Sequence, residues 1–333
     1  MRVALLTAPG ANNPCNHLHR AAATLDGEGV ISHTLALKDW GQVLDVAAES
    51  RPDVIALAGA AEPACLRALI GAGTHLMLEP PALAPEEAED LARTARQSGS
   101  IIALAWADTA YPMSRAALWM LRERRLGQVH AVFVEHTRAR PAPGGAAASG
   151  HVITSLAPAA ECFLSTVTGL KVRAVCAEAV LNPVTRGHDD AQILLRLEGH
   201  SRGVMTLSRT GARARLAVRV QGEQGTLEWS TSAPGLVRVT PVGRPTEVIT
   251  AAHAEAGPLA AEAVRSAGGN EGGVEALANL YRGMFEAVRA KREGRARKGL
   301  GREFPTTVDL TRACRFTAAA LDSARAGGVW AEL

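Results

Sequence analysis

The chain has 333 residues, 47% of them hydrophobic and 21% charged, and its 36 basic and 33 acidic residues give a net charge of +3. These values are typical of a globular protein long enough for two domains. A charge this small and evenly spread argues against nucleic acid and membrane as partners. The N-terminal apolar run is too short for a signal peptide, and no stretch approaches the roughly 18 apolar residues of a membrane span, so we expect a cytoplasmic protein.

Five cysteines are spread along the chain, at positions 15, 65, 162, 176 and 314. Their number is odd, and none of them are paired at the short spacings that zinc ligands or a redox disulfide require. We therefore expect no metal site and a reducing compartment.

The first part of the chain alternates short apolar runs with helical segments. Strands are predicted at 2–7, 30–37, 54–58, 75–78 and 101–105, and helices at 16–25, 41–50, 63–72, 86–97 and 114–124. Because a parallel neighbour needs a helical crossover, this order predicts an α/β domain with a Rossmann-like, doubly wound parallel sheet over residues 1–125. The last of these helices could pack with either domain.

The pattern changes after residue 125 to long runs in which polar and apolar residues alternate. Strands are predicted at 129–136, 172–180, 191–197, 203–208, 216–221, 225–230 and 236–241, and helices at 151–167, 275–291 and 307–326. Turn residues at hairpin spacing separate the strands, which predicts a C-terminal α+β domain with a large, mostly antiparallel open sheet over residues 126–333. Residues 304–333 supply a closing helix and a last strand.

The turn after the first strand is a candidate phosphate-binding loop. It contains Thr7, Gly10, Asn12 and Asn13. A glycine turn that opens a helix can hold a pyrophosphate on backbone N–H groups, and asparagine tolerates left-handed backbone. The turn has one glycine instead of the three in G-x-G-x-x-G, so an ordinary strand-to-helix turn is the alternative.

Asp39 is the candidate for contact with the ribose, because it follows the second predicted strand. An acidic residue there can accept hydrogen bonds from the ribose hydroxyls, whereas Lys38 beside it would favour a 2′-phosphate. The alternative is that Asp39 is a turn residue or a helix cap before Trp40.

The segment 71–85, GAGTHLMLEPPALAP, is followed by an acidic helix and resembles the glucose-fructose oxidoreductase, inositol 2-dehydrogenase and MocA (Gfo/Idh/MocA) family, whose pattern is approximately A-G-K-H-V-x-x-E-K-P-x-A. Three further segments are similar to that family: RERRLGQV at 122–129, QGEQGTLE at 221–228, and the closing helix and strand at 304–333. The resemblance covers nearly the whole chain.

The resemblance implies a dinucleotide-binding domain, NAD or NADP as cofactor, and hydride transfer at a sugar or polyol carbon. It also implies that the open C-terminal sheet joins copies into a homodimer or homotetramer. Gly59 lies in the segment that corresponds to the family's T-P-N-x-x-H, and Glu79 stands where the family has its glutamate, beside the nicotinamide.

The residues that usually carry the family's chemistry are replaced. The lysine of E-K-P is Pro80, and the later loop-helix motif has Ser155 for its first Asp, Ala159 for its His and Cys162 for its final Asp. Hydride transfer from a carbinol needs a group that takes the hydroxyl proton.

Five other residues are candidates for that role. They are His151, Asp108, Tyr111, Glu161 and His188. A structural or surface role is the alternative for each of them.

Two functional hypotheses follow. The first is an NAD(P)-dependent oxidoreductase that acts on a sugar or polyol-like substrate with an atypical active site. The second, which the replaced residues favour, is a non-catalytic pseudo-oxidoreductase that serves as a ligand-binding or protein-interaction subunit.

Overall fold

The computed structural model describes residues 1–8, 17–25, 29–59, 61–140, 151–183, 185, 187–263, 272–297 and 303–333. The chain divides into two compact units, Met1–Pro112 with Glu262–Thr311, and Met113–Ala261 with Arg312–Leu333. This division differs from the single boundary predicted after residue 125, because the chain returns to the first unit late in the sequence. Within the described residues, no helix is both long and apolar enough to cross a membrane.

The first unit contains a parallel sheet and its covering helices. The strands are β1 Arg2–Thr7, β2 Val30–Ala36, β3 Val54–Ala58, β4 Leu76–Leu78 and β5 Ile102–Leu104, and the helices are α1 His17–Ala23, α2 Gly41–Ser50, α3 Pro63–Gly71, α4 Pro85–Ser98, the 3₁₀ helix η1 Ala107–Ala110, and α8 Gly273–Arg292. The five strands run in the order β2-β1-β3-β4-β5, and every neighbouring pair is parallel. The predicted Rossmann-like sheet is confirmed.

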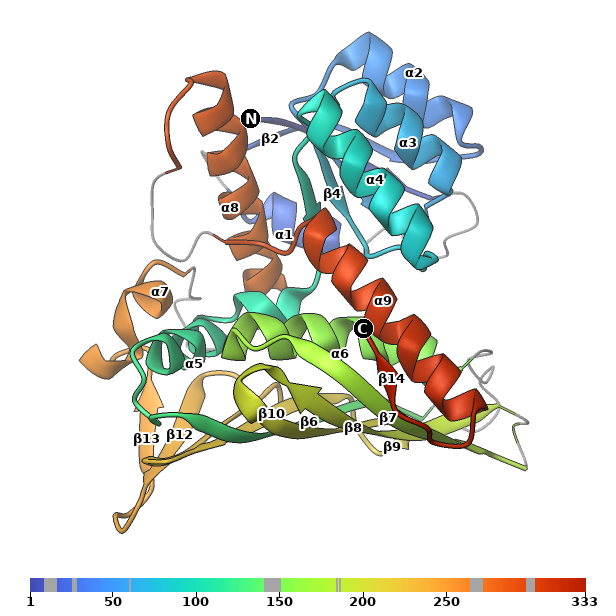
Figure 1. The fold of residues 1–333 in the computed structure, drawn as a ribbon. Helices are drawn as coiled ribbons and strands as arrows, with labels where there is room; N and C mark the ends of the chain where they lie inside the picture. Colours follow the sequence, from blue (N-terminus) through green and yellow to red (C-terminus); the bar gives the residue numbers. More distant parts are fainter. Residues whose placement is uncertain are drawn as a thin grey trace. The chain divides into compact units, whose positions relative to one another are not determined.

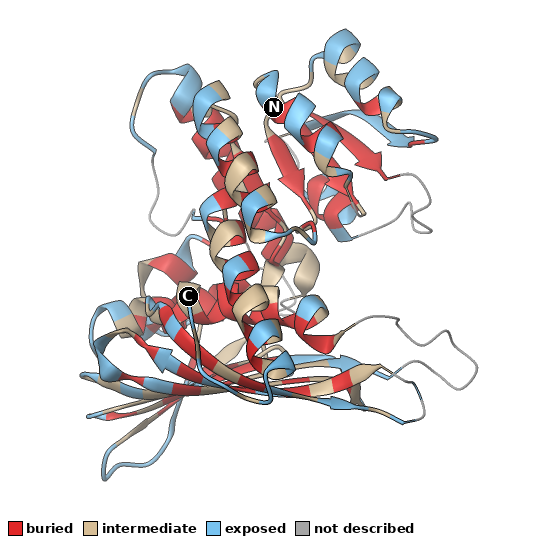
Figure 2. Cartoon of the chain, turned by 45° about the vertical axis from the view of Figure 1, so that its right-hand side comes forward, coloured by how far each residue is buried: buried red, intermediate tan, exposed pale blue. Residues whose placement is uncertain are grey.

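Burial on both faces explains why the central strands read as continuous apolar runs. All five residues of β3, VIALA, are buried, and so are all three residues of β4. Figure 2 shows these central strands in the colour of buried residues. A strand between two helical layers has no wet face, so its sequence does not alternate.

Helix α8 is part of the first unit, although it begins about 170 residues after the end of β5. The Tyr281 hydroxyl donates to the Leu18 carbonyl oxygen on α1 at 3.2 Å. The Asn279 side-chain amide, itself buried, donates to the Ala110 carbonyl oxygen in η1 at 3.0 Å. The first bond joins α8 to α1, and the second fixes the segment that follows β5.

The second unit is built on one large sheet. Its strands are β6 Val129–Ala139, β7 Val172–Leu181, β8 His188–Leu197, β9 Arg202–Gly211, β10 Arg215–Gly222, β11 Gly225–Ser230, β12 Leu236–Pro241, β13 Glu247–Thr250 and β14 Ala331–Glu332, and its helical elements are α5 Pro112–Arg122, α6 Val152–Thr168, η2 Glu198–His200, η3 Ala254–Ala256, α7 Gly257–Ala261 and α9 Thr307–Arg325. The order of the nine strands is β13-β12-β11-β10-β6-β9-β8-β7-β14. Only β6 and β9 pair in parallel among these neighbours, so the predicted, mostly antiparallel sheet is confirmed.

One face of this sheet is covered by α6, which lies across the central strands (Figure 1). Phe163 of α6 packs against Trp229 of β11 with ring centroids 5.1 Å apart. Along β8, buried residues alternate with partly or fully exposed ones, as a sheet with one covered face requires. The alternation seen in the sequence therefore reports which side chains meet α6.

The β10–β11 hairpin depends on two glycines of the QGEQGTLE motif. A Cβ on Gly222 would lie 2.4 Å from the Leu126 carbonyl oxygen and 2.9 Å from the Leu126 Cβ. Gly225 has φ of +159°, and a Cβ there would lie 2.5 Å from the Thr240 carbonyl oxygen. The hairpin therefore packs backbone against backbone where a side chain would not fit.

We expect Gly222→Ala to lower the free energy of unfolding by about 1–3 kcal/mol, because the added methyl group must displace backbone. Urea denaturation measures this change. Gly235→Ala is the matched control, since a Cβ at Gly235 meets nothing within 4 Å, and it should leave stability within about 0.5 kcal/mol of the parent or raise it slightly. Equal losses in the two variants would contradict the packing argument.

Candidate functional site

The carboxyl ends of the parallel strands bring Thr7, Gly59 and Glu79 to one edge of the first sheet. Thr7 pairs with Ala58 at the end of β3, and Leu57 pairs with Leu78 at the end of β4. Thr7 is buried, whereas Gly59 and Glu79 are half-buried. Gly10, Asn12 and Asn13 of the predicted phosphate loop lie outside the described residues.

Glu79 and Gly59 are joined directly at this edge. The Glu79 Oε2 atom accepts a hydrogen bond from the Gly59 backbone N–H at 2.8 Å. Gly59 has φ of +93°, a conformation that favours glycine because a Cβ would be strained there. The carboxylate thus fixes Gly59, the residue that follows β3, in this conformation.

Position 80 carries no group that could handle a proton. Pro80 is half-buried and Pro81 is buried, in the irregular segment between β4 and α4. A proline has neither a side-chain donor nor a backbone N–H. The turn between strand and helix is present without the lysine that the family pattern places in it.

Asp39 caps a helix in the structure. It is exposed after β2, and its Oδ1 atom accepts from the Gln42 backbone N–H at 3.2 Å, in the first turn of α2. The Lys38 backbone N–H in turn donates to the Gln42 side-chain oxygen at 2.9 Å. The described contacts are those of the helix-cap alternative.

Asp108 is a carboxyl group with a strongly raised pKa. It lies half-buried in η1, and loss of hydration by burial raises its pKa to about 6. Tyr111, which follows η1, is buried beside α8, where a Cβ on Gly273 would lie 3.6 Å from its hydroxyl oxygen. A carboxyl that titrates near pH 6 can exchange a proton under ordinary conditions.

His151 and His188 come together at the start of α6 in the second unit. Their rings stack with centroids 4.4 Å apart and an interplanar angle of 25°. His151 is the N-cap of α6, and its Nδ1 atom accepts from the Ile153 backbone N–H at 3.2 Å. With Nδ1 accepting, the neutral ring carries its proton on Nε2, so His151 presents an N–H donor.

The surroundings of His151 disfavour its charged form. Burial lowers the pKa of His151, and the nearby His188, Arg325 and Arg209 lower it further. Each of these neighbours is cationic or can become so, which makes an additional positive charge on His151 unfavourable.

The structure places Glu161 away from this pair. Glu161 is fully buried on α6, where its Oε1 atom accepts from Arg312 Nε at 2.7 Å and from the Ser165 hydroxyl at 2.6 Å. Ten helical residues separate it from His151, or about 15 Å along the axis. Its ion pair ties α6 to α9, which is a structural arrangement.

The replaced positions of the loop-helix motif also have packing roles. The Ser155 hydroxyl donates to the Val152 carbonyl oxygen at 3.1 Å, and Cys162 is fully buried. Ala159 is half-buried and offers no polar atom. The helix has kept its position on the sheet without the polar set of the family pattern.

Two residues behind His188 were not singled out from the sequence. Asp189 and Arg209 form a buried ion pair at 2.8 Å, with 9% and 7% of their side chains exposed. The only local signal is an acidic residue at an inward position of an alternating strand. The partner stands on another strand, so the pair becomes visible only in the folded chain.

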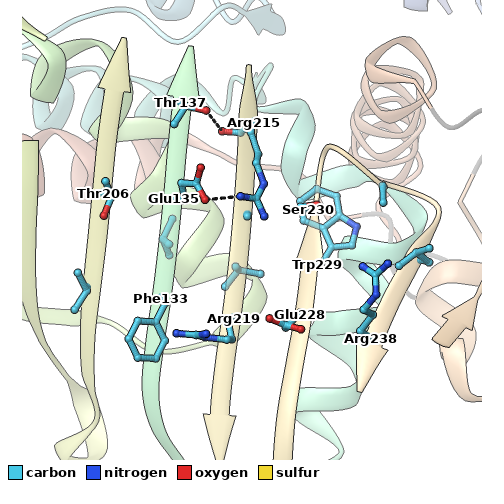
Figure 3. Close-up of a pocket in the computed structure, with 16 residues that line it drawn as sticks. Phe133, Glu135, Thr137, Thr206, Arg215, Arg219, Glu228, Trp229, Ser230 and Arg238 are labelled. Carbon is cyan, nitrogen blue, oxygen red and sulfur yellow. Dashed lines mark hydrogen bonds and ion pairs between the residues drawn. The ribbon is translucent and has the colours of Figure 1, made fainter. Parts of the chain in front are cut away.

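The open face of the large sheet holds a pocket of about 520 Å³. Figure 3 shows Arg215 bonded to Glu135, and Arg219 beside Phe133, on neighbouring strands. The Arg219 guanidinium lies 4.3 Å from the centre of the Phe133 ring. Over the described part of the chain, no group of three or more His, Cys, Asp or Glu residues could hold a metal ion.

Part of the second unit matches a known protein family. Residues 115–228 match the family profile described as GFO/IDH/MocA C-terminal domain. A comparison with curated proteins finds no match.

Solved structures are similar over nearly the whole chain. An oxidoreductase from Sinorhizobium meliloti is 24% identical with a TM-score of 0.86, over 99% of each chain. An inositol dehydrogenase homolog complexed with NAD+ from Azotobacter vinelandii is 20% identical with a TM-score of 0.89, over 100% of this chain and 98% of that one. A levoglucosan dehydrogenase in complex with NADH and levoglucosan is 15% identical with a TM-score of 0.78, over 100% of this chain and 99% of that one.

The fold class is therefore a Rossmann-like parallel sheet combined with a large open sheet, as in these dehydrogenase structures. Residues 115–228 thus match the C-terminal domain of the Gfo/Idh/MocA family, the family that the sequence motifs resemble, and the whole chain has the fold of these solved structures.

Replacing Asp108 with asparagine is expected to stabilise the protein at pH values above the pKa of the Asp108 carboxyl. The folded-state pKa of about 6 exceeds the ordinary value of 3.8, so the folded state binds the proton more tightly and loses stability as pH rises through this window. Asp108→Asn should therefore unfold with a free energy about 1–2 kcal/mol higher than the parent at about pH 7.5, allowing for partial exposure. The two proteins should be nearly equal at about pH 3, below this window. Urea denaturation at both pH values tests this, and a difference that does not change with pH would contradict it.

Proposed function

We propose that the protein is an NAD(P)-dependent oxidoreductase of the Gfo/Idh/MocA type, acting on a sugar or polyol-like substrate through an atypical active site. The observation that carries the proposal is the stacked pair of His151 and His188 at the start of α6. This is the helix on which the family pattern places its catalytic residues, and His151 stands one turn before the replaced position Ser155. Structural relatives crystallised with NAD+, or with NADH and levoglucosan, support the class of cofactor and substrate.

The edge formed by Thr7, Gly59 and Glu79 fits a dinucleotide. Gly59 exposes backbone without a side chain, and the predicted loop with Gly10, Asn12 and Asn13 follows Thr7 in sequence. Asp39 would meet the ribose with the carboxylate that now caps α2. The cofactor, when bound, supplies hydride transfer.

The two histidines divide the remaining chemistry. When a carbinol is oxidised, the hydride leaves its carbon and the hydroxyl proton must pass to a base. His151 presents its Nε2–H as a donor to the substrate oxygen, because Nδ1 is engaged by Ile153. His188, whose ring lies against it, takes the proton.

A second function, that of a non-catalytic ligand-binding or protein-interaction subunit, is favoured by one observation. Pro80 leaves the E-x-P turn without a cation, and the family's other catalytic positions hold Ser155, Ala159 and Cys162. Under this alternative the histidine pair binds a ligand and transfers no proton.

Substitution of the histidines separates the two functions. His151→Asn keeps a good helix cap and removes the imidazole, and His188→Gln removes the second ring. We expect each to lower kcat by about 10²–10⁴-fold with sugars or polyols that reduce NAD+ or NADP+, while calorimetry shows cofactor binding unchanged. The oxidoreductase proposal would be abandoned if millimolar NAD(H) and NADP(H) failed to bind the parent, or if turnover survived both substitutions.

The homo-oligomer expected for this family is proposed to form through the open face of the large sheet. Neighbouring strands place Leu194, Val204, Phe133 and Arg219 in one row across that face, by their pairing registers. Leu194 is 47% exposed, which is unusual for a leucine in the middle of a strand. This row, apolar except for Arg219, would be covered by a second copy in the cytoplasm.

Sedimentation velocity is expected to show a dimer or tetramer for the parent and a smaller species for Leu194→Glu, because the interface would bury a charge opposite Val204. The control is Val242→Glu, at a residue 71% exposed between β12 and β13, which should leave the assembly unchanged. A monomeric parent would contradict the proposal.

A further inference from the structure

The buried ion pair of Asp189 and Arg209 lies where two apolar rows would otherwise continue. On β8, Ala191, Ile193 and the following inward residues are buried, and on β9 so are Met205 and Leu207. Asp189 and Arg209 extend these rows at the end of the strands next to His188. A buried ion pair is seldom more stable than an apolar pair of similar volume, so stability alone does not account for it.

The bonds of this pair converge on the first residue of β8. Arg209 Nη2 donates to Asp189 Oδ1 at 2.8 Å and to the His188 carbonyl oxygen at 3.3 Å. Asp189 Oδ2 accepts from the Thr185 hydroxyl at 2.5 Å. These hydrogen bonds outweigh the effect of burial and hold the pKa of Asp189 below its ordinary value. The Asp189 carboxylate therefore stays charged and keeps its ion pair with the Arg209 guanidinium.

We propose that Arg209 is the positioning residue of the histidine site: by binding Asp189 and the His188 carbonyl oxygen, it fixes the start of β8 so that the His188 ring stacks on His151. A role of Arg209 in catalysis rests on the proposed function. Its role in positioning His188 does not. Arg209 need not touch a substrate to act in this way.

The charge of Arg209 has a second effect on the same site. The groups that face His151 from the packed elements are His188 on β8, Arg209 on β9 and Arg325 on α9. Arg209 is the more deeply buried of the two arginines, with 7% of its side chain exposed against 74% for Arg325. The Arg325 Nη1 atom also lies 3.3 Å from Asp322 Oδ1. The charge of Arg209 lowers the pKa of His151 less than burial, His188 and Arg325 do, but in the same direction, and so favours the neutral His151 ring.

The test is an NMR titration of the full-length protein labelled with ¹³C at histidine, with His151→Asn and His188→Gln to assign the signals. Arg209→Met should raise the pKa of His151 toward its ordinary value and abolish the ring-current shifts of the stacked pair. Arg209→Lys keeps the charge but lacks the planar fork, so it should retain the low pKa and lose part of the ring-current shift. Arg215→Met removes the exposed ion pair with Glu135 on the other face of the sheet and should change neither readout.

The proposal is overturned if folded Arg209→Met keeps both the titration curve and the ring-current shifts of the parent, or if Arg215→Met changes them equally. Should Arg209→Met not fold, Asp189→Asn decides the matter. That variant leaves the Arg209 charge uncompensated, so the pKa of His151 should fall further. An unchanged pKa would contradict the positioning role of Arg209.

Neither cofactor nor substrate enters this titration, so its outcome is independent of turnover. A protein without dehydrogenase activity but with the expected titrations would reject the oxidoreductase proposal and retain the positioning role. If the enzyme is active, Arg209→Met should also shift the acid limb of the kcat/KM profile to higher pH, which a purely structural role would not do.

Discussion

The packing of α6 on the large sheet is the constraint on which the second unit depends. The helix buries the inward residues of the central strands, and Phe163 against Trp229 marks the middle of that core. The same packing places the first turn of α6 beside the start of β8, where His151 meets His188. His151 serves both purposes, because the imidazole that caps the helix is also the candidate functional group.

The chain has the fold of the similar solved structures, but other residues stand where the Gfo/Idh/MocA pattern has its polar groups. Glu79 still binds the turn after β3 through the Gly59 N–H, although the neighbouring position is Pro80. Glu161, a candidate from the sequence, is committed to a buried ion pair with Arg312. Catalysis by this protein would therefore depend on groups outside the positions of the family's catalytic pattern, above all His151 and His188.

Most secondary structure was predictable, since burial imposes its period directly on a strand. Continuous runs such as VIALA predicted the parallel sheet, and alternation predicted the antiparallel one. β13 and α7 were not predicted. β13 is a short edge strand in which only Ile249 is buried, and α7 has five residues, so neither carries enough periodic signal.

By itself, the sequence predicted the order of strands and helices, the resemblance to the Gfo/Idh/MocA family, and the positions at which the chain departs from that family's pattern, because each of these is written in local patterns. Only the tertiary structure decided that residues 262–311 rejoin the first unit and that Arg209 pairs with Asp189 behind His188. The physical reason is that side-chain partners are chosen by strand register and helix packing, which join residues far apart in the chain.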